Sequence, residues 1–197
     1  MVLPPRHTPV HVVDGGLIAT PPDNLISGGG IDGTNPRIRV DVGEPSFFDG
    51  RQFRTFKELN IALGATYVIK AVTTKNIILY GLELSLTSGE VKLSTVVGGN
   101  EGGTFSETLP LFPRNTMSER PTPLYTPTTV LTAGGTHTDG TILDLLWVKT
   151  ADNSNFAANV GIAPGDERGV AAGTYYFRLN AVVAATGIFK ARFEERL

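Results

Sequence analysis

The first 45 residues contain no aromatic side chain, and this constrains the fold more than any other feature of the sequence. All of the ten Phe, five Tyr and one Trp lie from Phe47 onward, whereas seven of the thirteen prolines lie before Ser46. Such a segment cannot bury enough apolar surface to offset the cost of ordering it alone. Proline also favours extended backbone. We therefore predict an extended N-terminal arm over residues 1–46 and a folded domain over residues 47–197.

The arm does not have the composition of a solvated linker, because branched aliphatic residues recur along it. A segment with regularly placed apolar residues but no core of its own needs another protein surface to cover them. Strand addition to an exposed sheet edge is one available binding mode. We expect the arm to bind its partner through Val10, Val12, Val13, Leu17, Ile18, Leu25 and Ile26.

Charge and cysteine content exclude several classes of protein. Cysteine is absent, so neither disulfides nor thiolate metal sites can form. The net charge of −2 lies entirely in the arm, which has three Arg against five acidic residues, so the domain is neutral. Direct nucleic-acid binding, which needs clustered Lys and Arg, is not expected. Neither a signal peptide nor a membrane-spanning segment is expected, because no apolar stretch suits either.

From Phe47 onward, short apolar runs with period-two alternation alternate with turn residues. The strand candidates are residues 65–73, 77–86, 91–97, 128–132, 141–150, 174–183 and 187–194. Turn signals such as Ser88-Gly89 and Asp139-Gly140 separate them. About eight strands predict an all-β domain, a jelly-roll-like β-sandwich. A short helix around residues 154–160 is the one helical candidate.

The chemistry-bearing residues do not form a recognisable active site. His7 and His11 have metal-ligand spacing on a helix, but Pro9 lies between them. His137 is the single histidine of the domain and lies in a sequence typical of a hairpin turn. The glycine-rich residues 98–103 lack the Lys that a phosphate-binding loop requires, and no Gly-x-Ser-x-Gly occurs. We therefore predict no enzymatic activity and no cofactor.

Trp147 and the neighbouring aromatic residues allow two interpretations. Residues 143–148 have the pattern of a core strand, and aromatic residues of sandwiches are mostly core. Exposed aromatic residues would instead form a platform for carbohydrate. The alternative function is thus a receptor-binding or carbohydrate-binding module.

Two segments are candidates for contacts between subunits. Residues 109–127 form the longest stretch without a strand pattern and contain five prolines, which is typical of a crossover between sheets or of a contact loop. Glu-Arg pairs recur there and at the C-terminal end, and Arg is enriched at interfaces. The intersubunit candidates are Arg114, Glu119, Arg120, Glu195 and Arg196.

The domain, from about Phe53 onward, resembles the head decoration or cement proteins of tailed bacteriophages. Five segments carry the resemblance: V-G-G-N-E-G-G-T-F at 97–105, R-N-T-M-S-E-R-P at 114–121, G-G-T-H-T at 134–138, A-G-T-Y-Y-F at 172–177 and F-E-E-R at 193–196. The resemblance implies a jelly roll, a homotrimer and a place on the outer surface of the virion. It gives no catalytic residue, and the arm lies outside it.

The sequence therefore predicts a structural virion protein that is made in the host cytoplasm. Its arm would bind the major capsid protein or other virion subunits, and the domain would stabilise the junctions between capsomers. A component of the phage tail, neck or fibre would need the same arm and β-sandwich, and remains the alternative.

Overall fold

The computed structural model describes residues 45–116, 125–150, 158–161 and 168–196, together with four short strands before residue 45. The chain divides into two compact units, Met1–Glu44 and Pro45–Leu197. In the first unit, β1 (His11–Val13) pairs antiparallel with β2 (Gly16–Ile18), and β3 (Ile31–Asp32) pairs with β4 (Asn35–Pro36). The described parts of the predicted arm are therefore short antiparallel pairs. Its extended form as a whole stays a prediction.

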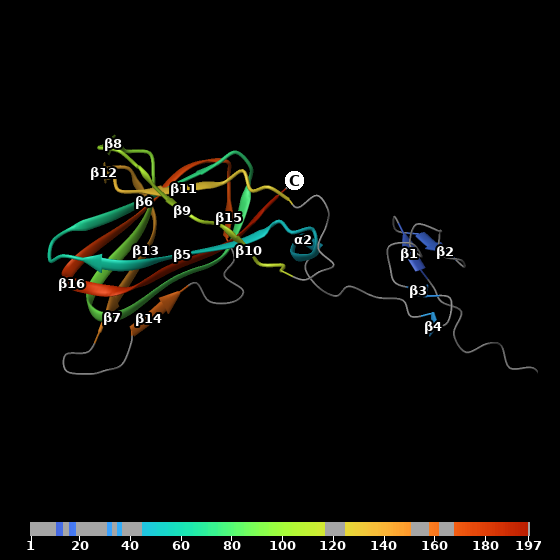
Figure 1. Cartoon of the computed structure of the whole chain (residues 1–197). Coiled ribbons are helices and arrows are strands. Elements are labelled where there is room, and N and C mark those ends of the chain that lie inside the picture. The colour runs from blue at the N-terminus through green and yellow to red at the C-terminus, as the bar shows by residue number, and fades with distance from the viewer. Residues whose placement is uncertain are drawn as a thin grey trace, which may run out of the picture. The chain divides into compact units, whose positions relative to one another are not determined.

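The second unit is almost entirely β-structure (Figure 1), which confirms the all-β prediction. Among its described residues, the helix is the single turn α2 (Pro45–Phe48). The long strands are β5 (Gln52–Ile61), β6 (Thr66–Thr73), β7 (Ile77–Val97), β13 (Thr141–Lys149) and β16 (Gly173–Glu195). The short strands are β8 (Asn100–Gly102), β9 (Glu107–Leu109), β10 (Phe112–Pro113), β11 (Val130–Ala133), β12 (Thr136–Thr138), β14 (Ala158–Gly161) and β15 (Arg168–Val170).

The central strand is β16, and every pairing that it makes is antiparallel. One edge of β16 pairs with β7 along almost its whole length. Its other edge pairs first with β6 and then with β5, which follow each other along it. Backbone hydrogen bonds from Gly64 N to Ala181 O (2.8 Å) and from Ala181 N to Ala65 O (3.0 Å) bridge the gap between β5 and β6.

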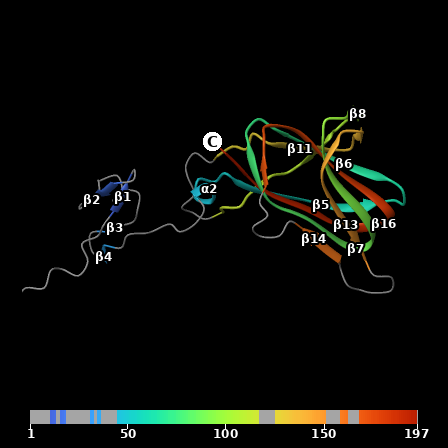
Figure 2. The same cartoon turned by 180° about the vertical axis from the view of Figure 1, so that it is seen from behind.

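Further strands extend this sheet on both sides. The reverse view in Figure 2 shows β13 and β14 beside β7. On one side β11 and then β9 follow β6, and β10 follows β5. On the other side β13, β14 and β15 lie in succession along the outer edge of β7. The β8–β12 pair forms a separate two-stranded ribbon.

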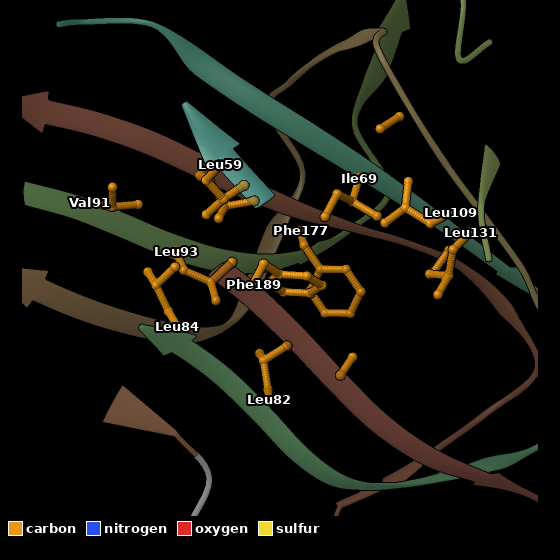
Figure 3. Close-up of a cluster of buried hydrophobic side chains, with 14 of the residues drawn as sticks. Leu59, Ile69, Leu82, Leu84, Val91, Leu93, Leu109, Leu131, Phe177 and Phe189 are labelled. Atoms are coloured by element: carbon orange, nitrogen blue, oxygen red, sulfur yellow. The ribbon is translucent and has the colours of Figure 1, made fainter. Parts of the chain in front are cut away.

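The long strands bend in the middle, so that the antiparallel sheet curls and the two halves share one core. In β7 the bend lies at Gly89, where φ is +88°. In β16 the register shifts between Ala181 and Gly187. Phe177 and Phe189, from the two halves of β16, pack with ring centroids 5.5 Å apart, at the centre of the cluster in Figure 3.

Period-two alternation predicted the buried face of β7 correctly, because Leu82, Leu84 and Leu86 are almost completely buried. The predicted breaks were partly wrong. Ser88-Gly89 lies inside one long strand, and the two C-terminal strand candidates are both β16. Residues 158–160, predicted to be helical, lie in β14, and the rest of that segment lies outside the described residues.

Candidate functional site: an exposed apolar edge strand

Strand β13 forms an edge of the curled sheet. Its inner edge pairs with β7 from Thr141↔Val97 to Lys149↔Glu90. Among the described strands, none pairs with its outer edge. The turn before it contains Asp139 and Gly140, both with positive φ, so the predicted turn chemistry places the start of β13 against β7. No described strand uses the N–H and C=O groups of this outer edge, and the Leu145 N–H donates to the Asp144 side chain (2.9 Å).

Most side chains of β13 are apolar, although an edge strand usually carries charge, and its two charged residues are Asp144 and Lys149. Ile142, Leu143, Leu145 and Trp147 are 54%, 51%, 56% and 57% exposed. The prediction that residues 143–148 form a core strand was therefore wrong for three of these residues. Alternation identifies the side chains that share a face, but it does not show whether another layer covers that face. A long, apolar and unpaired edge is typical of a protein-binding surface.

Trp147 is held in a fixed position although more than half of it is exposed. Its Nε1 donates a hydrogen bond to Glu90 Oε1 (2.8 Å), and the Lys92 ammonium lies 4.2 Å from a ring centroid. Glu90 is itself buried. A side chain that is already ordered loses little conformational entropy on binding, which favours association.

The two C-terminal glutamates, by contrast, are bound inside the chain. Glu195 is completely buried. Its carboxylate accepts hydrogen bonds from the backbone N–H groups of Thr128 (2.9 Å) and Thr129 (2.6 Å) and from the hydroxyl of Tyr125 (2.7 Å). Burial alone would raise the pKa of Glu195, but these hydrogen bonds outweigh it, so that its pKa lies below the ordinary value.

Glu194 points to the opposite face of β16, as the strand geometry predicted. Its carboxylate accepts hydrogen bonds from Ser46, Tyr80 and Arg196, the last at 2.7 Å. Burial raises its pKa, and the hydrogen bonds again lower the pKa below the ordinary value. The two neighbouring carboxylates thus have separate sets of partners and do not form an acid–base pair.

The structure describes three of the five predicted intersubunit residues, Arg114, Glu195 and Arg196. Arg196 is exposed, whereas Arg114 is half-buried and donates to Gln52 Oε1 (2.6 Å). For Glu195 the carboxylate has an internal structural role, and its contact with a neighbouring subunit stays a prediction. Glu119 and Arg120 lie outside the described residues.

The predicted partner-binding residues of the arm are described only in part. Four of them, Val12, Val13, Leu17 and Ile18, lie in β1 and β2. The other three, Val10, Leu25 and Ile26, lie outside the described residues. Binding of the arm to a partner therefore stays a prediction.

His137 lies in a polar cluster that the sequence did not predict. Its ring stacks on Tyr176 with centroids 3.7 Å apart, and Nε2 donates to Gly98 O (2.7 Å). Glu101 accepts hydrogen bonds from Tyr176 and from Lys70 (2.8 Å), and the Lys70 hydrogen bond is the main cause of the lowered pKa of Glu101. Burial, followed by the hydrogen bond to Glu101, raises the pKa of Tyr176.

This cluster joins three strands and the β8–β12 ribbon. Tyr176 packs with the buried Val68 and Val96, so the aromatic rings form a small second core. The Nδ1 atom of His137 is buried without a hydrogen-bond partner. Contacts between distant segments of the chain bring these residues together. A local sequence pattern could therefore not have identified the cluster.

Among the described strands, β13 thus has both an outer edge that pairs with no other described strand and four exposed apolar side chains. In the described part of the chain, no group of three His, Cys, Asp or Glu is placed to hold a metal ion. None of the described helices is long and apolar enough to cross a bilayer.

Comparisons of the chain with protein-family models, with curated proteins and with solved structures find no match in any of the three.

Proposed function

We propose that this protein is a structural subunit of a larger assembly and binds other chains through β13. The observation that carries the proposal is the outer edge of β13, which pairs with none of the described strands and carries four exposed apolar side chains. The resemblance to bacteriophage decoration proteins supports a more specific form of it. In this more specific proposal the protein is a cement protein on the outer surface of the virion, and its curled sheet is a jelly-roll-like sandwich.

The partner on β13 is a second copy of this chain. Fully burying a large apolar side chain contributes roughly 1.5–3 kcal/mol of gross transfer free energy. Because the four side chains are already about half buried, one contact gains only a few kcal/mol of apolar burial. This is of the order of the entropy lost on association. A closed homo-oligomer repeats the contact in every subunit, and a homotrimer is the form that the resemblance implies.

The N-terminal unit provides the attachment to the shell, through the major capsid protein or another virion subunit. Its predicted contacts are mainly apolar, so attachment should weaken little with added salt, unlike attachment to phosphate. Several weak anchors in one oligomer bind together with high avidity. The domain then has no catalytic role.

Light scattering after size exclusion tests the contact between copies. The full-length protein should be an oligomer, and Leu145→Lys should be a monomer with unchanged secondary structure. Leu63→Lys is the matched control, because Leu63 is 72% exposed and lies outside β13. It should leave the oligomer intact. A monomeric wild-type protein at high concentration, or an oligomeric Leu145→Lys, would contradict the proposal.

Deletion of residues 1–44 tests the attachment. The truncated protein should fold, because Pro45–Leu197 is a compact unit, and it should no longer bind shells that lack the protein. Binding at normal strength would show that the N-terminal unit is not the anchor.

Exposure of Trp147 also favours the alternative, a carbohydrate-binding or receptor-binding module of a phage tail. A glycan array would separate the two functions. Strong hits that Trp147→Ala abolishes would support the alternative, and their absence would leave β13 as a protein-binding surface.

A further inference from the structure

A basic groove crosses β5, β16 and β7 on the side opposite the shared core. Its volume is about 510 Å³, which lies within the range of small-molecule sites. Its side chains alternate along each strand with the buried residues of the core. The lining residues include Arg54, Phe56, Gly81, Glu83, Lys190 and Arg192.

Two arginines in this groove lie directly opposite each other. Arg192 of β16 is the register partner of Arg54 of β5, and both are exposed. Like charges at such positions repel each other and destabilise a sheet. Among the described residues, neither guanidinium forms an ion pair. Glu83, a carboxylate that lines the groove, forms its ion pair with Lys190 (3.0 Å). The charge of Arg192 makes a smaller contribution to the lowered pKa of Glu83.

The third strand leaves room for the Arg192 guanidinium. Arg192 is the register partner of Gly81 in β7. A Cβ at Gly81 would lie 2.9 Å from both Nε and Nη2 of Arg192, so the guanidinium lies directly over this glycine. Because residue 81 has no side chain, the guanidinium of Arg192 can lie close to the backbone of β7.

One wall of the groove is aromatic. Phe56 lines it and stacks on Phe112 with ring centroids 5.5 Å apart and an interplanar angle of 10°. The two rings are 50% and 37% exposed. The groove therefore offers two exposed guanidinium groups, neither in an ion pair with a described residue, beside an accessible apolar surface.

We propose that this groove is a binding site for a compact ligand with at least two oxyanion groups. Arg54 and Arg192 each bind one oxyanion group through two N–H donors, which relieves the repulsion between them. Lys190, oriented by Glu83, adds a third donor, and Phe56 contacts the apolar part of the ligand. Phosphate and carboxylate groups share the required chemistry. The proposal is independent of the role of β13.

Isothermal titration calorimetry of the full-length protein at low salt tests the site, with inorganic pyrophosphate and with citrate as probes. At least one probe should bind saturably, and the tighter probe identifies the preferred group. Arg192→Gln should weaken binding roughly ten-fold or more, because it removes charge-assisted hydrogen bonds. Its melting temperature without ligand should not fall, since the substitution also removes the repulsion with Arg54.

Two further variants separate a built site from general attraction by positive charge. Gly81→Ala keeps every charge but displaces the Arg192 guanidinium, and it should weaken binding several-fold. Lys149→Gln removes an exposed cation from the far edge of the sheet, and it should change the affinity by less than about two-fold. Absence of saturable binding of both probes to the wild-type protein would overturn the proposal, as would equal losses in Arg192→Gln and Lys149→Gln.

Discussion

Replacing Glu195 by Gln should destabilise the folded domain, because the carboxylate fixes the end of β16 to the segment before β11. Two backbone N–H groups, of Thr128 and Thr129, and the Tyr125 hydroxyl donate to it. Tyr125 already accepts from Lys75 Nζ (2.9 Å), so its own proton has to go to Glu195. A glutamine amide cannot accept all three bonds, because one of its two polar atoms is a donor.

The expected loss follows from the change in the acceptor. Hydrogen bonds to charged groups contribute roughly 1.5–3 kcal/mol each, against about 0.5–1.5 kcal/mol for neutral ones. Three weakened bonds therefore amount to about 3 kcal/mol, and the smaller desolvation cost of the neutral amide offsets part of this. We expect a net loss of about 2 kcal/mol in the free energy of unfolding, or roughly 4–8 °C in Tm for a domain of this size.

Urea denaturation at neutral pH measures the effect. Glu58→Gln is the matched control, because Glu58 lies on β5 and is exposed. Its substitution should change stability by less than about 0.5 kcal/mol. A loss below about 0.5 kcal/mol for Glu195→Gln as well would refute the inference that this carboxylate stabilises the end of β16.

The pH dependence gives a second, independent measure of the same interaction. The pKa of Glu195 is lowered in the folded protein. Its contribution is therefore fully present above the carboxyl pKa of the unfolded chain, about 4.3, and is lost as the pH falls toward the folded pKa. The stability of Glu195→Gln should fall less steeply than that of the wild type below about pH 4.3. Parallel curves would contradict this reasoning.

Two other features of the domain lead to measurable effects. Gly89→Ala should lower the free energy of unfolding by about 3 kcal/mol, because φ is +88° and the new Cβ would lie 2.2 Å from Ala184 O. Gly64→Ala, at φ +74° with open space around it, should cost only about 1–2 kcal/mol, and equal losses in urea denaturation would contradict this account of the bend. Burial, together with hydrogen bonds to carboxylates, raises the pKa of Tyr67 and Tyr176. Spectrophotometric titration should find that the phenols of Tyr67 and Tyr176 ionise well above the ordinary tyrosine pKa of about 10, and ionisation of every tyrosine near that value would contradict it.

The β-structure of the domain was predictable because its signal is local. Alternating leucines in β7 identify a half-buried strand whatever lies around it. The length of the strand was not predictable, because Ser88-Gly89 has the same composition in a turn and in a bend. At Gly89 the decisive fact is the close approach of Ala184 and Ala185 from β16, which are almost a hundred residues away in the chain.

The candidate sites were less predictable, because each depends on contacts between distant segments. Trp147 and its neighbours have a core pattern, and only the position of β13 at the edge of the sheet leaves them exposed. His137 was identified as the single histidine of the domain, but its partner Tyr176 comes from another strand. Arg54 and Arg192 have no local signal at all, since their proximity results from the pairing of β5 with β16.

The residues that stabilise the fold and the residues proposed to bind partners lie on opposite faces of the same strands. On β16, Phe177 and Phe189 are buried in the shared core, whereas Arg192 faces the groove. Within the isolated chain, two opposed arginines and an open apolar edge are both unfavourable. Features that break a local rule without a gain inside the fold are expected at functional sites. Substitutions of Arg192 or Leu145 should therefore reduce binding without reducing stability, whereas substitutions on the inner face should do the reverse.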